Sequence, residues 1–164
     1  MDNLPKNLTH LTFGEKFWYP VNKLPNKLTH LSFGKNFYCS INALPKSLTH
    51  LSFGFYFNKK ISDIPKMVLP INLTNVTLSF GPWFDTPLSN LSDKITCINF
   101  GKNFKQNIDK DNLPKNLTQL FFNKVAQFNN SLDNLPENLT HLTLGRQTPV
   151  RLAHPKIFII FEMT

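Results

Sequence analysis

Residues 4–14 read LPKNLTHLTFG, and almost the same eleven residues return at 24–34 as LPNKLTHLSFG and at 44–54 as LPKSLTHLSFG. Looser copies follow at steps of 20 to 25 residues, and the last one, FIIFEM at 158–163, is strongly altered. Aligned on the Leu of LTHL, the intact copies centre on Leu8, Leu28, Leu48, Leu73, Ile95, Leu117 and Leu139. A repeat of this length is typical of a solenoid, in which each unit forms one coil that packs on its neighbours.

The apolar residues of each unit predict the path of one coil. They follow the pattern L-x-x-L-x-F, and in the first unit this spacing predicts a short strand over Leu8–Phe13. A glycine such as Gly14 then permits a backbone bend. The Leu-Pro that opens the next unit excludes a long helix on the return segment, because proline is not accommodated inside a helix.

The sequence therefore predicts a single domain over residues 1–164 with a β-rich, leucine-rich-repeat-like fold. We expect a right-handed solenoid of seven to eight coils, with one parallel β-sheet and little helix. Units should begin near residues 4, 24, 44, 69, 91, 113 and 135, and a degenerate unit near 154. Stacking places each Phe over the Phe of the next coil, so truncating Phe33 or Phe37 to Ala should cost about 3–5 kcal/mol.

The unit L-P-x-x-L-T-H-L-x-F-G-x-x-F-N-x-x-I resembles the FNIP repeat, which is named for its Phe-Asn-Ile-Pro wording. The Phe-Asn pair stands at Phe57-Asn58 and Phe128-Asn129, and the downstream aliphatic residue at Ile61 and Leu132. The resemblance implies a leucine-rich-repeat-like layout, a role in protein contact, and a source among social amoebae or the giant viruses of amoebae. Such proteins often carry an F-box before the repeats, which implies substrate recognition for ubiquitin ligation. The first Leu-Pro leaves no room for one, so we expect that role only with a partner in trans.

Composition predicts a folded intracellular protein. The chain has 164 residues, of which 41% are hydrophobic, and no apolar run approaches the length of about 20 residues that crosses a bilayer. The first residues, MDNLPKNL, do not read as a secretory signal, and Cys39 and Cys97 give no disulfide framework. We therefore expect a cytoplasmic location, or the host cytoplasm or virion if the source is viral, with no membrane contact.

The formal net charge of +8 raises the alternative of a basic nucleic-acid-binding surface. The charge comes mainly from lysines, and an excess of Lys, Asn, Phe and Ile is also typical of an A/T-rich genome. Most of these lysines fall in predicted turns, and exposed aromatics for base stacking are not evident beside them. The sequence thus favours solvated edges over nucleic-acid binding. The lysines concerned are Lys6, Lys16, Lys27, Lys35, Lys46, Lys102 and Lys115.

Two polar columns should run along the open face of the sheet. One is an unbroken threonine column: Thr9, Thr29, Thr49, Thr74, Thr96, Thr118 and Thr140. The second holds His10, His30, His50, Asn75, Cys97, Gln119 and His141. Neighbouring histidines are weak candidates for a metal site, but side chains of adjacent strands do not converge on a point and no carboxylate recurs to orient them. We expect a surface column of histidines whose crowded charges lower their pKa values.

No nucleophile, base and orienting group recur together, so the sequence predicts no catalytic residues, no cofactor and no enzyme. The sequence is most distinctive where it departs from the repeat pattern. Phe158, Ile159, Ile160 and Phe161 form a strand apolar on both faces, which predicts a contact. We expect a homodimer through a two-fold interface there, with a strand that folds back as the alternative.

The middle of the array, ISDIPKMVLPIN at 61–72, is also irregular, and Ser79-Phe80 is inserted in the following unit. Insertions in repeat arrays map to one loop face, often the binding face. Trp83 and Trp18 are therefore candidate exposed aromatics for a protein partner. The sequence as a whole predicts a non-enzymatic protein-interaction or structural repeat module that self-associates through a terminal strand.

Overall fold

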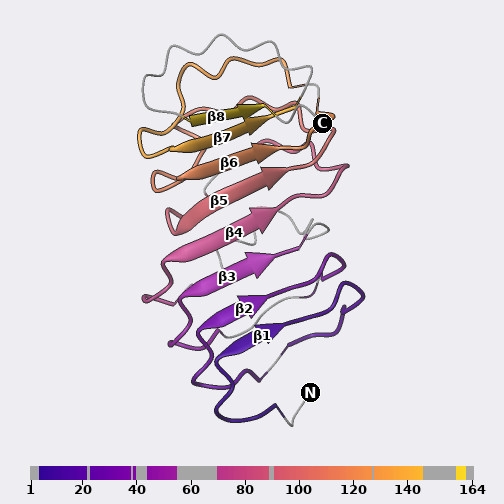
Figure 1. The fold of residues 1–164 in the computed structure, drawn as a ribbon, viewed down its shortest axis with the longest axis vertical. Helices are drawn as coiled ribbons and strands as arrows, with labels where there is room; N and C mark the ends of the chain where they lie inside the picture. The colour runs from indigo at the N-terminus through magenta and orange to yellow at the C-terminus, as the bar shows by residue number, and fades with distance from the viewer. Residues whose placement is uncertain are drawn as a thin grey trace.

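The computed structural model describes residues 4–21, 23–37, 39, 44–54, 70–88, 91–126 and 128–145, and the backbone of strand 158–161. Eight strands follow one another along the chain and form one sheet in the order β1 to β8, with every neighbouring pair parallel (Figure 1). Their bounds are β1 His10–Thr12, β2 His30–Ser32, β3 His50–Phe53, β4 Asn75–Ser79, β5 Ile95–Phe100, β6 Gln119–Phe122, β7 His141–Leu144 and β8 Phe158–Phe161. The predicted leucine-rich-repeat-like solenoid with a single parallel sheet is confirmed.

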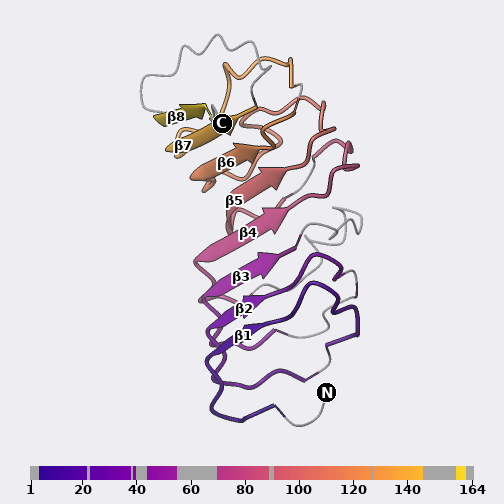
Figure 2. The same ribbon diagram turned by 45° about the vertical axis from the view of Figure 1, so that its right-hand side comes forward.

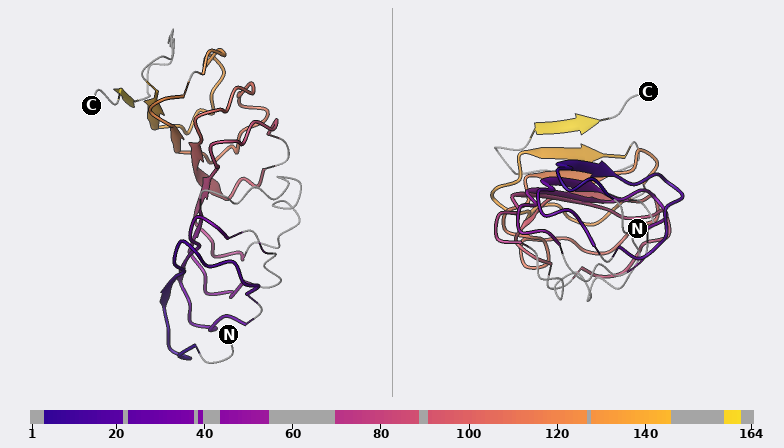
Figure 3. Two further views of the ribbon diagram at one scale, coloured as in Figure 1. Left: turned by 90° about the vertical axis from the view of Figure 1, so that its right-hand side faces the viewer. Right: turned by 90° about the horizontal axis from the view of Figure 1, so that it is seen from below.

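Each strand is one side of a coil, and the turns and return segments form the other sides. Seen along the stack, the strands lie on one side and the rest of each coil lies behind them (Figure 3). The strand arrows all point the same way (Figure 2), and the sheet lines the concave side of a curved array (Figure 3, left). Within the described parts of the chain there is no helix, and hence none that is long and apolar enough to traverse a bilayer.

Two recurrent turns set where each strand begins and ends. The proline turn closes with a hydrogen bond from the backbone N–H of Leu8 to the carbonyl of Pro5, at 3.1 Å, and the later coils repeat it. The glycine turn closes with a bond from the N–H of Phe17 to the carbonyl of Gly14, at 3.0 Å. The proline turn includes Leu8, so β1 begins two residues later than the strand that the sequence predicts.

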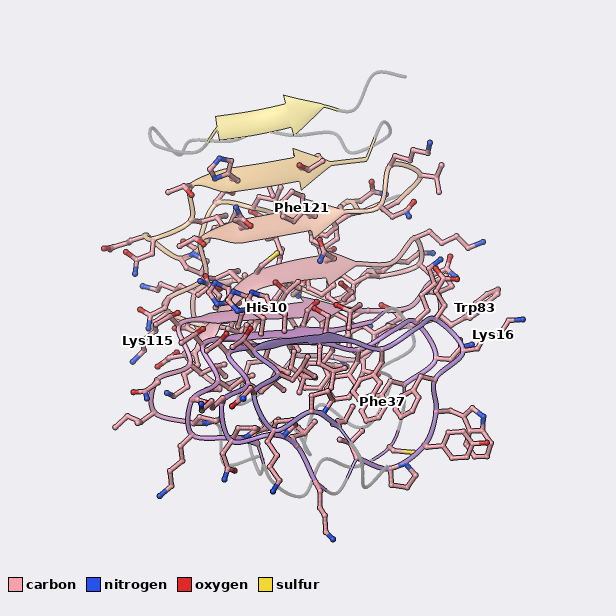
Figure 4. The ribbon with its side chains drawn as sticks, turned by 60° about the horizontal axis from the view of Figure 1, so that its bottom comes forward. His10, Lys16, Phe37, Trp83, Lys115 and Phe121 are labelled. Atoms are coloured by element: carbon pink, nitrogen blue, oxygen red, sulfur yellow. The ribbon has the colours of Figure 1, made fainter. Side chains whose placement is uncertain are left out.

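The space behind the sheet is filled by a double ladder of phenylalanines. Within one coil the rings of Phe33 and Phe37 stack with centroids 4.0 Å apart, and between coils Phe33 stacks on Phe53 at 5.7 Å and Phe37 on Phe17 at 6.2 Å. Phe37 has 0% exposure and lies on the inner side of the sheet (Figure 4). Because each ring is covered by the rings of adjacent coils, stability comes from contacts between neighbouring coils.

At Gly34, Gly54, Gly101 and Gly145, the glycine after the strand is required by close approach between coils. A Cβ at Gly34 would overlap the carbonyl oxygen of Gly14, and one at Gly54 would overlap that of Gly34. At Gly145 a Cβ would lie 2.7 Å from the carbonyl oxygen of Ala126 and 2.8 Å from that of Asn123. Glycine at these positions lets a coil lie against the backbone of the preceding one, whereas Asn123 takes the equivalent place after β6.

The predicted unbroken columns are wrong between β4 and β5. The pairing register passes from Val76↔Ile95 to Thr77↔Cys97, with an irregularity between Val76 and Thr77. The reason is the inserted Ser79-Phe80, because Phe80 takes the ladder position over Phe100, at 5.7 Å between ring centroids. Ring stacking aligns the two coils at the glycine end. Cys97 therefore pairs with Thr77 rather than with Asn75. The Thr96 hydroxyl donates to the carbonyl of Val76 rather than to that of Thr74.

Candidate interaction surface

The three histidines of the first coils stack along the open face of the sheet. The register pairs His10 with His30 and His30 with His50, and the ring centroids are 4.2 and 4.1 Å apart. Figure 4 shows His10 on the strand face, away from the phenylalanine ladder. In β4 the column continues with Asn75, whose Nδ2 donates to Nε2 of His50 at 3.0 Å. The predicted histidine column therefore exists over these four strands.

The adjacent threonines fix which ring nitrogen carries the proton. The Thr29 hydroxyl donates to the carbonyl of Thr9 at 3.1 Å, and the Thr49 hydroxyl donates to that of Thr29 at 3.1 Å. Each hydroxyl also lies 2.9 Å from Nδ1 of the following histidine, His30 or His50. A hydroxyl has one proton, already donated, so Nδ1–H of the histidine must be the donor. Nε2 of these rings is consequently a hydrogen-bond acceptor, as the amide of Asn75 requires at His50.

The stack disfavours protonation of its central ring. Partial burial of His30, and then the rings of His50 and His10, lower its pKa below the ordinary value of 6.5. Neighbouring rings are stacked and nearly parallel, with interplanar angles of 13° and 10°, so their outward nitrogens run side by side rather than converging. In the described part of the chain, no group of three or more His, Cys, Asp or Glu side chains is arranged to hold a metal ion.

Cys97 is unsuited to nucleophilic chemistry. Its side chain is buried, and burial raises the pKa of the thiol against the opposing effect of a hydrogen bond with Thr77. A reactive thiol needs a lowered pKa and exposure. Cys39 is half-buried, and its Sγ lies 2.8 Å from the carbonyl oxygen of Trp18. The Cys97 thiol therefore lacks the surroundings of a catalytic cysteine.

Exposed aromatic residues lie on the turns beside the glycine end of the strands. Trp83 is 74% exposed, and Nζ of Lys102 lies 5.3 Å from its ring centroid. Trp18 is 47% exposed and stacks on Tyr19 at 4.5 Å. Both predicted tryptophans are thus exposed, but they belong to coils with two others between them. Two further exposed apolar side chains were not predicted from the sequence. Tyr19 directly follows Trp18, which could have indicated its exposure, and Ile71 is 88% exposed in a proline turn.

The lysines lie at the two edges of the array, as predicted, and not across the strand face. Figure 4 shows Lys115 at one edge, and Lys16 and Trp83 at the other edge in different coils. An open pocket near Lys115 is lined also by Lys110, Asp111 and Glu137. Because these four side chains carry charges of both signs, the pocket has no strong preference for a charged ligand.

Two predicted interaction segments lie wholly or partly outside the described residues. The side chains of Phe158, Ile159, Ile160 and Phe161 are not described, although the backbone of β8 pairs parallel with β7 in the register Leu142↔Ile159 and Thr143↔Ile160. The irregular segment at 61–69 is likewise outside them. The contact predicted at the last strand therefore stays a prediction.

Comparisons with known proteins agree with the coil geometry. The profile of the FNIP Repeat family matches residues 1–36, 19–54, 39–81 and 84–124. Among solved structures, the chain is similar to CroV588, described as a novel circular LRR protein, with 38% sequence identity and a TM-score of 0.65. The match covers 96% of this chain and 27% of that one, so this chain spans about a quarter of the length of its structural relative. No curated protein matches the chain.

Proposed function

Because the chain belongs to the FNIP repeat family and has a leucine-rich-repeat-like fold, we propose that it is a non-enzymatic protein-interaction module that also self-associates. The partner surface is the open strand face together with the glycine-turn edge that carries Trp83. Repeat arrays of this kind present extended concave surfaces on which side chains from successive coils act together.

The observation that carries this proposal is the preorganisation of the strand face. His30 and His50 are held by stacking and by threonine hydroxyls that are themselves bonded to the preceding coil. Asn75 is held in turn by His50. Side chains fixed before binding lose little conformational entropy when a partner docks, which favours affinity. The exposed Trp83 supplies the large aromatic area that is enriched at interface hot spots.

The test is affinity capture from the native cell with a face variant and a matched control. Ser32→Arg with Ser52→Arg places two cations on neighbouring strands of the open face, where both serines are half-buried. Asn26→Arg with Asn116→Arg adds the same charge at exposed turn positions. We expect the parent and the control to retain the same proteins and the face variant to lose them. Equal retention by all three chains would reject the strand face as the partner surface.

Self-association is proposed on the outer edges of the sheet. Among the described strands the order begins at β1 and ends at β8, so each of these two has one edge without a partner strand in that part of the chain, and such an edge is a template for another strand. The relative CroV588 is described as circular, which supports an array whose terminal coils meet further coils. Light scattering compares the parent with Ile159→Lys combined with Ile160→Lys. A fall in mass on substitution supports self-association through β8, and an equal mass in both chains rejects it.

A further inference from the structure

The glycine-type turns that follow β4, β5 and β6 are stacked along one edge of the array (Figure 1). The strands enter these turns in register, since Phe100 at the end of β5 pairs with Phe122 at the end of β6. Side chains at the same place in each turn are therefore neighbours along the stack. Each turn closes with the same backbone hydrogen bond, from Phe84 to Gly81 at 3.1 Å, from Phe104 to Gly101 at 3.4 Å and from Ala126 to Asn123 at 2.8 Å.

Large apolar side chains are exposed at the third position of these turns. Trp83 is 74% exposed in the turn after β4, and Val125 is 59% exposed in the turn after β6. Figure 4 shows Trp83 at the outer side of this edge. Because neighbouring strands are about 4.8 Å apart, these two side chains begin about 10 Å from each other. Exposed apolar side chains gathered on one surface are typical of an interaction site.

The second position of the same turns holds lysines without carboxylate partners. In the first coils this position holds Glu15 and Lys35, which form an ion pair between neighbouring coils. After β5 and β6 it holds Lys102 and Lys124, both exposed, and neither forms an ion pair within the described part of the chain. Nζ of Lys102 instead lies 5.3 Å from the ring centroid of Trp83, a contact that leaves its charge in place. Two like charges thus stand where the first coils pair opposite ones.

The carboxylate of Asp85, on the same edge, is engaged with the backbone and an amide of the next coil. Its Oδ1 accepts the backbone N–H of Lys105 at 2.8 Å and Nε2 of Gln106 at 3.1 Å. The exposed side chain of Lys105 adds a third ammonium group to the surface. The edge therefore carries an excess of positive charge beside its apolar side chains.

We propose that this aromatic-basic edge, formed by Trp83, Lys102, Lys105, Lys124 and Val125, binds an acidic segment of a partner protein that also carries apolar side chains. This inference rests on the interaction module proposed above and names the chemistry of its partner. Carboxylates of the segment supply the counter-charge that the edge itself lacks. Apolar side chains of the segment cover the exposed tryptophan and valine.

An acidic peptide fits this edge better than single-stranded nucleic acid does. Binding of successive bases needs a series of aromatic faces, whereas this edge has one aromatic ring, that of Trp83, and Lys102 lies over it. Val125 is aliphatic and offers no face for a base. An extended peptide rises about 3.3 Å per residue, so apolar residues about three positions apart span the distance from Trp83 to Val125.

The first experiment measures binding of a fluorescein-labelled peptide, Glu-Glu-Leu-Glu-Glu-Leu-Glu-Glu, by fluorescence anisotropy. The edge variant is Lys102→Gln with Lys124→Gln, and its matched control is Lys27→Gln with Lys46→Gln, which removes the same charge from exposed positions of proline turns. Parent and control should bind the peptide equally, whereas the edge variant and Trp83→Ala should each bind at least about tenfold more weakly. Thermal unfolding checks that all four chains are folded. Binding by the edge variant as tight as that of the parent would overturn the proposal.

The second experiment tests the chemistry of the ligand on the parent chain. A peptide with lysine in place of each glutamate should not bind, and binding of the acidic peptide should weaken as salt is added. Labelled oligothymidylate of similar length should bind more weakly than the acidic peptide. Tighter binding of oligothymidylate would overturn the proposal in favour of nucleic acid. A parent chain that captures proteins from the cell but does not bind the acidic peptide would overturn this inference and leave the proposed function intact.

Discussion

Truncation of equivalent phenylalanines in adjacent coils tests whether neighbouring coils supply the stability. Phe37 is fully buried between Phe33 and Phe17, so Phe37→Ala should cost about 3–5 kcal/mol of unfolding free energy. Phe17 stacks on Phe13 at 4.2 Å and on Phe37 at 6.2 Å, but it is only partly buried, because no coil packs on its other side among the described residues. Phe17→Ala should therefore cost less, roughly 2 kcal/mol. At about 2–4 °C per kcal/mol for a chain of this size, the expected falls in Tm are roughly 6–20 °C and 4–8 °C.

The assay is thermal and urea unfolding followed by circular dichroism, at a concentration where sedimentation shows a monomer. The condition matters because self-association would bury further residues and change the cost of each substitution. If both substitutions lower the stability of the monomer equally, the stability does not follow nearest-neighbour burial and the reasoning is refuted.

Three further predictions concern single side chains. Alkylation should be slower at Cys97 than at Cys39 in the folded chain and equal in urea, because burial shields the Cys97 thiol and raises its pKa; faster reaction at Cys97 would contradict this. Because the pKa of His30 is lowered in the folded chain, this histidine takes up its proton at a higher pH in the unfolded chain than in the folded one. Stability should therefore fall as the pH drops from about 7.5 to about 5.5, and less so in His30→Gln when urea midpoints are compared. Trp83→Ala should change the unfolding free energy by less than about 0.5 kcal/mol, because the ring is 74% exposed, while abolishing partner capture; retained capture would exclude Trp83 from the interface.

Much of the fold is predictable because each coil repeats the same physical requirements. Leu31, Phe33 and Phe37 are buried as the repeat pattern predicts, and the prolines and glycines close the turns between strands. A single copy of the repeat pattern would be compatible with several folds. Its recurrence at a near-constant step restricts the chain to stacked coils, since every coil must bury the same apolar face on the next.

The shift at β4 and β5 was not predictable in the same way. An insertion such as Ser79-Phe80 can be absorbed as a bulge in a loop or as a change of strand register. The choice depends on whether Phe80 or Leu78 stacks on the next aromatic ring, which is a three-dimensional competition. Phe80 stacks on both Phe84 and Phe100, at 4.1 and 5.7 Å, and the polar columns move with it. A prediction that aligned the units only at their Leu residues could not include this competition.

Hydrogen-bond directions were also outside the reach of the sequence. The recurrent Thr-His pair predicts two adjacent polar columns, but it does not say that the hydroxyl is already committed to the preceding coil. The structure adds this fact for Thr29 and Thr49, and the acceptor character of Nε2 in His30 and His50 follows. A partner for this face must therefore offer donors to it, as the amide of Asn75 does within the chain.

The same close approach gives opposite meanings to two glycines. At Gly34 the carbonyl of Gly14 excludes any side chain, so the residue is explained by the chain itself. At Gly14 no atom of the described residues lies within 4 Å of a Cβ, and an alanine there would restrict the unfolded chain. Gly14→Ala should therefore leave the stability unchanged or slightly raised, whereas Gly34→Ala should lower it. Thermal unfolding of the two variants tests this difference, and an equal fall in Tm for both would contradict it.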